Sequence, residues 1–220
     1  MSVPTLIIGN KNYSSWSLRP WILLKHYQIN FNEIRVPLFT ETTNDELSAY
    51  NSDFKVPILK DSELIVWDSL SILEYVSEKY LDNKGWPDDI EARSFARSIS
   101  AEMHSSFSHV RNELPMNCRK KFNNIKLSKE AQHEVERIKY LWRTSRNKYA
   151  DQGNWLFGDF SIADAMFAPI ALRLVGYNIP LHGEEENYIK QILTHPNIIE
   201  WIEAGKAEKE IIDEDEIEIA

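Results

Sequence analysis

In the first third of the chain, short apolar runs take turns with segments whose apolar residues have helical spacing. Short apolar runs predict four strands, at residues 6–8, 34–36, 56–59 and 64–67. Apolar side chains at helical spacing predict three helices, at residues 16–27, 43–50 and 69–80. The predicted order is strand, helix, strand, helix, strand, strand, helix, which is a small mixed α/β unit.

The pattern changes after Leu81. Residues 82–87 read Asp-Asn-Lys-Gly-Trp-Pro, a stretch rich in turn formers, and only helical spacing follows it before the acidic tail. These later helical patterns cover residues 88–113, 128–150, 161–175, 185–193 and 196–209. We therefore expect an α/β domain at 1–81, a linker at 82–87 and an all-helical domain at 88–220.

The end of the chain, residues 208–219, mixes acidic residues with isoleucines. Chain termini often fray, so the pattern favours a frayed end over a binding element. The role of this acidic tail stays open at the level of the sequence.

Composition and charge exclude several classes of protein. Hydrophobic residues make up 43% and charged residues 27% of the chain, which is the balance of a folded globular protein. A net charge of -9 disfavours nucleic acid as a partner. No apolar run approaches the length of a membrane span, and the first residues lack the pattern of a signal peptide. We expect a cytoplasmic protein without a membrane partner.

Cysteine and histidine spacing excludes the common metal and disulfide sites. The single Cys118 permits no intrachain disulfide and no CxxC pair, and we interpret it as an inert thiol. None of the six histidines belongs to an HExxH motif or an i, i+4 pair, so no metal site is predicted.

Three local sequences carry candidate chemistry. The first, Ser14-Ser15-Trp16-Ser17-Leu18-Arg19, lies between the first predicted strand and the first helix. The second is Lys55-Val56-Pro57-Ile58-Leu59 with Trp67-Asp68-Ser69 one short strand later. The third, Gly158-Asp159-Phe160-Ser161-Ile162-Ala163-Asp164, has the spacing of a helix capping box. Taken separately, each has a purely structural reading: a serine helix cap, a proline-bearing edge strand and a capped helix.

The layout and the order of these sequences resemble the cytosolic glutathione transferase superfamily, from Leu6 to about Trp201. The first sequence is similar to the Ser-Ser-Cys-x-x-Arg signature of the zeta class, with Trp16 in the cysteine position. The chain is thus identified as a zeta-like, serine-type bacterial member, similar to maleylacetoacetate isomerases. The resemblance implies a thioredoxin-like N-terminal domain, an all-α C-terminal domain, glutathione as the co-substrate, and a homodimer.

The resemblance also implies a thiol donor. A thiol has a reference pKa of about 8.5, so its anion must be stabilised near neutral pH. A serine hydroxyl and helix N-terminal amides can do this. Ser14 is the expected catalytic residue and Ser15 the alternative, while Arg19 supports the loop. Other classes use a tyrosine, so Tyr13 is either a second alternative or an aromatic wall of the pocket.

Five residues of the second sequence are implied to bind glutathione. Val56, before a cis Pro57, would pair with the cysteinyl backbone, and Lys55 would reach the glycine carboxylate. Asp68 suits the γ-glutamyl ammonium, and Ser69 at a helix start suits the γ-glutamyl carboxylate.

The remaining candidates belong to the helical domain. The second substrate is expected to contact Tyr13 together with Arg111 and Met116, which lie near a predicted break in the helix. Ser161 and Asp164 match the buried capping motif of the family, so their implied role is structural.

Three functions fit these residues. The first is a glutathione transferase in which a serine activates the thiol for attack on a small electrophile. The second is a glutathione-dependent cis/trans isomerase, which Trp16 in the cysteine position disfavours. The third is a non-catalytic interaction protein with the same fold. Glutaredoxin-like thiol exchange is disfavoured because no cysteine occupies the Ser14 region. The natural electrophile is not legible in the sequence.

Overall fold

The computed structural model describes residues 3–50 and 52–217, and its first part is a four-stranded sheet. The strand order is β2-β1-β3-β4; β1 pairs with β2 in parallel and with β3 antiparallel, and β3 pairs antiparallel with β4. The strands are β1 (Thr5–Ile8), β2 (Asn32–Arg35), β3 (Ile58–Asp61) and β4 (Leu64–Trp67). This sheet and its helices confirm the predicted thioredoxin-like domain.

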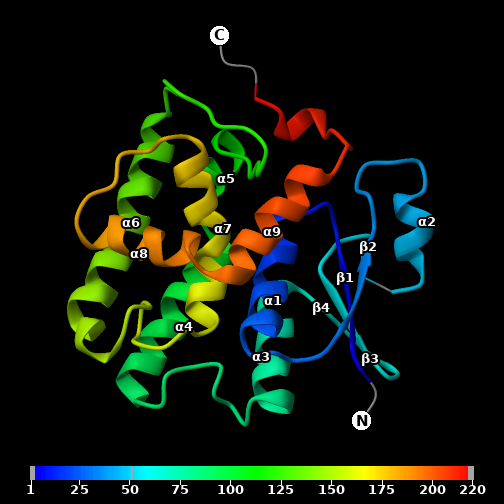
Figure 1. Ribbon diagram of the computed structural model, residues 1–220, viewed down its shortest axis with the longest axis horizontal. Coiled ribbons are helices and arrows are strands. Elements are labelled where there is room, and N and C mark those ends of the chain that lie inside the picture. Colours follow the sequence, from blue (N-terminus) through cyan, green and yellow to red (C-terminus); the bar gives the residue numbers. More distant parts are fainter. Residues whose placement is uncertain (1–2, 51, 218–220) are drawn as a thin grey trace.

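Helices cover both faces of this sheet (Figure 1). Side chains of β1 alternate between the two faces, as the pleat of a strand requires. Leu6 and Ile8 enter the main hydrophobic core, whereas Ile7 packs in a smaller cluster with Leu47 of α2. The helices of this part are α1 (Ser15–His26), α2 (Thr43–Ser48) and α3 (Ser69–Tyr80).

The rest of the described chain is helical, which confirms the expected all-α region. It contains α4 (Ile90–Ser105), α5 (Ser108–Glu113), α6 (Lys129–Tyr149), η1 (Ala150–Gln152), α7 (Ile162–Gly176), α8 (Glu184–Leu193), α9 (Pro196–Ala207) and η2 (Asp213–Asp215). Helix α7 is apolar on nearly every side, as expected of a helix buried in a core. It contacts α1 and α4, and therefore ties the sheet domain to the helices (Figure 1).

The single helix predicted at 88–113 is in fact two helices. Helix α4 ends at Ser105 and α5 begins at Ser108, with Phe107 between them at φ +64°. A left-handed backbone is uncommon for a non-glycine residue. The Phe107 side chain is only 4% exposed, so its burial offsets the unfavourable backbone conformation. Apolar spacing alone does not reveal such a turn.

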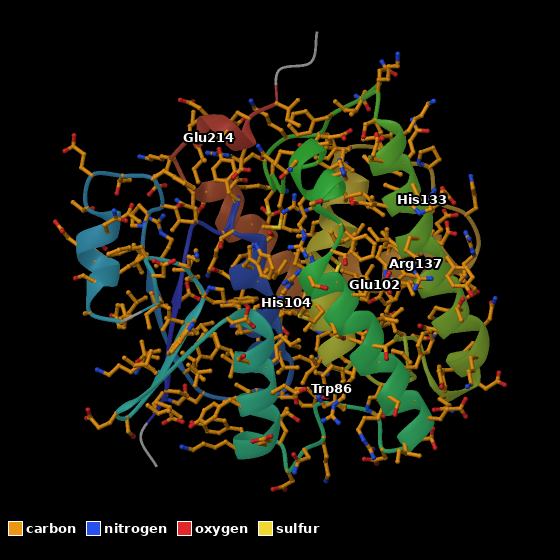
Figure 2. All side chains as sticks on the ribbon, turned by 180° about the vertical axis from the view of Figure 1, so that it is seen from behind. Trp86, Glu102, His104, His133, Arg137 and Glu214 are labelled. Carbon is orange, nitrogen blue, oxygen red and sulfur yellow. The ribbon has the colours of Figure 1, made fainter. Side chains whose placement is uncertain are left out.

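The expectation of a frayed C-terminal end is wrong for residues 208–217; residues 218–220 lie outside the described chain. The Glu208 carboxylate accepts hydrogen bonds from the backbone N–H groups of Lys11 and Asn12, at 2.8 and 3.0 Å. Arg119 donates to the backbone carbonyls of Glu208 and Glu210. Figure 2 labels Glu214 on this segment. The acidic residues thus fasten the segment to the loop that follows β1.

A pair of histidines joins α1 to the start of α9. His26 Nδ1 lies 2.9 Å from His195 Nε2, and His195 Nδ1 accepts a hydrogen bond from the Asn197 N–H. His195 must therefore donate through Nε2, and the bond needs His26 Nδ1 without a proton. Burial, followed by the neighbouring His195, lowers the pKa of His26 to about 4, whereas Asp159 acts in the opposite direction.

We expect acid to weaken this connection between the domains. The unfolded chain binds a proton at His26 near pH 6.5 and the folded chain only near pH 4, so stability should fall as pH drops between these values. Thermal unfolding of the unmutated protein should show this slope, and His26→Gln should flatten it. The control is His133→Gln, at an exposed position on α6 (Figure 2). An identical pH dependence in the unmutated protein and His26→Gln would contradict the expectation.

Candidate functional site

Two neighbouring pockets lie beside the start of α1. The larger one has a volume of about 640 Å³ and the smaller one about 310 Å³. Trp16, Lys55 and Val56 line both. The larger pocket reaches toward α2 and the C-terminal segment, whereas the smaller one lies between β3, β4 and the start of α3.

The smaller pocket gathers the residues of the second sequence motif. Val56 and Pro57 line it, and the peptide bond between them is cis. Asp68 and Ser69 line it as well. Lys55 stands at the rim with an exposed side chain, where its ammonium pairs with the Asp53 carboxylate at 2.8 Å. The five residues proposed from sequence therefore surround one cavity.

Asp68 and Ser69 are held at the start of α3 by polar contacts with residues of α1, α3 and α4. Asp68 is the N-cap residue, and its carboxylate accepts hydrogen bonds from the N–H groups of Leu70 and Ser71. Its other oxygen lies 3.1 Å from Nε2 of His104, which α4 brings to the domain boundary (Figure 2). The buried Ser69 hydroxyl accepts a hydrogen bond from Arg19 Nη1 at 3.2 Å. No sequence motif marks His104; only the fold brings it to Asp68.

Ser14 and Ser15 line the larger pocket, but their hydroxyl groups have different partners. Ser14 occupies the N-cap position of α1 without a side-chain capping bond, and its hydroxyl donates to Ser17 Oγ at 2.7 Å. Ser15 Oγ accepts a hydrogen bond from Arg173 Nη2 at 2.9 Å. Simple helix capping therefore does not account for either hydroxyl group.

The Tyr13 hydroxyl is occupied by the C-terminal segment. It donates to Glu216 Oε1 at 2.5 Å and accepts from Arg119 Nη2 at 2.6 Å. Burial, followed by the hydrogen bond to Glu216, raises the pKa of Tyr13. Its ring lines the larger pocket, whereas its hydroxyl is engaged in holding the tail.

Three arginines form a positive region at the start of α1, where two of them lie against Trp16 and Arg173 binds Ser15. The guanidinium groups of Arg19 and Arg111 lie 4.2 and 4.6 Å from the centre of the Trp16 ring. Burial, followed by the charges of Arg111 and Arg173, lowers the pKa of Arg19 well below its usual value. Burial also lowers the pKa of Arg173 to about 10, so this side chain remains protonated near neutral pH. The arrangement favours anionic groups in the adjoining pockets.

The other residues expected to meet the second substrate are placed differently. Neither Arg111 nor Met116 is among the residues lining these two pockets. Arg111 donates to backbone carbonyls at the end of α4, and Met116 is buried in the core. The larger pocket instead draws on residues that no motif marked, namely Leu38, Phe39, Asn44, Arg173, Ile212 and Asp215.

Asp164 is fully buried at the start of α7, where it completes a capping box with Ser161. Its carboxylate accepts four hydrogen bonds, from the N–H and hydroxyl of Ser161, the N–H of Leu156 and the hydroxyl of Tyr188. Burial raises the pKa of Asp164 to about 6, which leaves the group mostly ionised at neutral pH. It lines neither pocket, so the contacts are those of a structural residue.

Other kinds of site find no support in the part of the chain that the structure describes. Within residues 3–50 and 52–217, no cluster of three or more His, Cys, Asp or Glu residues has the geometry of a metal site. No helix in these residues has both the length and the apolar character that a membrane span needs. Burial raises the pKa of the Cys118 thiol to about 12, so this thiol is protonated at neutral pH.

Comparisons with known proteins show what the sequence and the fold are similar to. Residues 13–79 match the family model of the glutathione S-transferase N-terminal domain. A probable maleylacetoacetate isomerase from Caenorhabditis elegans is 24% identical over 182 residues, which cover 81% of this chain and 82% of the relative.

Solved structures share the fold over nearly the whole chain. A glutathione transferase homologue from Burkholderia gl BGR1, solved with bound glutathione, is 22% identical with a TM-score of 0.69, covering 93% of this chain and 99% of its own. An unclassified glutathione S-transferase from Bombyx mori is 18% identical with a TM-score of 0.72, covering 93% and 94%.

Residues 13–79 therefore match a glutathione S-transferase N-terminal domain, and the described chain has the glutathione transferase fold.

Proposed function

We propose that this chain is a glutathione transferase that binds glutathione in the smaller pocket and an electrophile in the larger one. The observation that carries the proposal is the continuity of the site. Trp16, Lys55 and Val56 line both pockets, which join the γ-glutamyl candidates at α3 to the serine loop at α1.

The smaller pocket offers a complementary group for each end of the tripeptide. The γ-glutamyl carboxylate fits the Ser69 hydroxyl and the N-terminus of α3, and its ammonium fits Asp68. The cysteinyl backbone would pair with Val56. The glycine carboxylate would extend toward the Lys55 ammonium. Lys55 and Asp53 are both exposed, so their ion pair is weak and the glycine carboxylate can replace Asp53 as the partner of Lys55.

The thiol would then face Ser14 and Ser15 at the N-terminus of α1. One serine hydroxyl donates a hydrogen bond to the sulfur, and the helix amides add positive potential. A hydrogen bond to a charged group contributes about 1.5–3 kcal/mol, which lowers a thiol pKa by about one to two units. The thiol proton passes to solvent. The thiolate forms a bond to an electrophilic carbon, and the displaced electron pair leaves with a leaving group or moves into the acceptor.

Isomerisation is the second candidate, because the relative from Caenorhabditis elegans is named a probable maleylacetoacetate isomerase. The same thiolate would add to a conjugated double bond and then be eliminated after rotation, which regenerates glutathione. A non-catalytic interaction protein is the third candidate, and it predicts no function for the serine hydroxyls. The homodimer, the cytoplasmic location and the domain boundaries at 81 and 88 remain part of the proposal.

Ser69→Ala should weaken glutathione binding. The substitution removes the hydroxyl that would meet the γ-glutamyl carboxylate, and a buried charged group short of a partner costs about 1–3 kcal/mol. That corresponds to roughly a 5- to 150-fold rise in the dissociation constant. Calorimetric titration with glutathione measures it.

The matched control is Ser71→Ala, which removes an exposed hydroxyl from the same helical turn. It should leave the dissociation constant nearly unchanged. A protein without measurable glutathione affinity before mutation would contradict the proposed function and favour the interaction protein.

A further inference from the structure

Arg173 links the helical region directly to the serine loop. It lies on α7, is 7% exposed and forms part of the wall of the larger pocket. Its Nη2 donates to Ser15 Oγ at 2.9 Å, while Nη1 donates to the backbone carbonyls of Arg111 and Leu114. The carbonyl contacts tie α7 to the end of α5. The bond to Ser15 ties α7 to the start of α1 and places a positive charge on the serine hydroxyl.

The two serines differ in where their hydroxyl hydrogens go. The Ser14 hydrogen is used in the 2.7 Å bond to Ser17 Oγ, and Ser17 Oγ also accepts from the Gly9 N–H. Ser15 accepts the bond from Arg173 and, among residues 3–50 and 52–217, donates none. The Ser15 hydrogen therefore remains available to a group in the pocket. The Ser14 hydrogen must leave Ser17 before it can serve a ligand.

A hydroxyl that accepts from a cation is also a better donor. The charge of Arg173 draws electron density from Ser15 Oγ and strengthens any bond that this hydroxyl donates. Arg111, Asp215 and Tyr177 are the titratable groups that act on Arg173. Asp215 is the carboxylate among them and lines the same pocket, whereas Arg111 adds a second positive charge.

We propose that Arg173 is a positioning residue that orients the Ser15 hydroxyl, and that Ser15 rather than Ser14 donates the hydrogen bond to the glutathione thiolate. The inference rests on the proposed function, because it concerns the same bound thiol. It adds a residue from the helical region to a step otherwise performed by the sheet domain.

The test is the pKa of glutathione bound to the protein, followed by the ultraviolet absorbance of the thiolate as pH is varied. Ser15→Ala should raise this pKa by about one to two units, which is a 10- to 100-fold loss of thiolate below the pKa. Ser14→Ala should shift it by much less. Ser15→Thr, which keeps a hydroxyl, should retain most of the unmutated value.

Arg173→Gln separates positioning from a structural role. With Ser15 present, Arg173→Gln should raise the pKa of the bound thiol. In the Ser15→Ala background, the same substitution should raise this pKa by clearly less. Equal shifts in both backgrounds would overturn the inference, because Arg173 would then act independently of Ser15.

The remaining outcomes are also decisive. A larger shift in Ser14→Ala than in Ser15→Ala would overturn the inference and leave the proposed function standing. If the unmutated protein does not bind glutathione, both are wrong. Should Arg173→Gln fail to fold, the comparison of Ser14→Ala, Ser15→Ala and Ser15→Thr still decides which serine donates.

Discussion

Asp164→Ala is expected to lower the free energy of unfolding by about 3–5 kcal/mol, the range for removing one partner of a buried charged network. The carboxylate accepts four hydrogen bonds inside the core, and the alanine would leave the N–H groups of Leu156 and Ser161 and the Tyr188 hydroxyl without it. Because small proteins are stable by only about 5–15 kcal/mol, the variant should unfold at much lower urea concentration.

Asp159→Ala is the matched control, since this neighbouring acid is exposed. Its unfolding midpoint should stay close to that of the unmutated protein. Equal midpoints for Asp164→Ala and Asp159→Ala would show that the buried network contributes little to stability.

Replacing both Ser14 and Ser15 with alanine is expected to reduce turnover about 10- to 100-fold near neutral pH. The double variant removes both serine hydroxyls, so the bound thiol loses the hydrogen bond that lowers its pKa. Part of the activity should return at higher pH, where the thiol ionises without help. Stability should also fall, because the variant removes the buried acceptor of Arg173 and the partner of Ser17, so turnover is compared at a temperature where both proteins are folded. The measurement is turnover of a small electrophile over a range of pH.

Tyr13→Phe is the control for this variant. The Tyr13 hydroxyl is bound to Glu216 and Arg119, so removing it should affect the attachment of the tail more than turnover. If Tyr13→Phe abolishes activity and the double serine variant keeps it, a tyrosine is the thiol donor. The fold assignment would be unaffected by that result.

The sequence predicts most of the fold because its signals are local. The short apolar run of β1 and the helical spacing in α1 and α3 each depend on neighbouring residues, and these elements lie close to where they are expected. The left-handed Phe107 that separates α4 from α5 is a conformation of one residue and leaves no mark on the apolar spacing.

The candidate site likewise contains residues that local motifs predict and contacts that they do not. Lys55, Pro57, Asp68 and Ser69 stand in short motifs, and the structure gathers them around one pocket. The contacts of Arg173 with Ser15, of His104 with Asp68 and of Glu208 with Lys11 join residues far apart in the chain. Such pairs follow from tertiary packing, which a single sequence does not encode in any local pattern.

The attachment of the C-terminal segment has a consequence for biosynthesis. Glu208 binds the backbone of Lys11 and Asn12, three residues before Ser14 and Ser15, and Glu216 binds Tyr13. A ribosome releases residues 208–217 only after the preceding described residues have emerged. The nascent sheet can therefore pair its strands early, but the serine loop lacks these contacts until residues 208–217 have left the ribosome. A partly synthesised chain should hold glutathione poorly even when its sheet is complete.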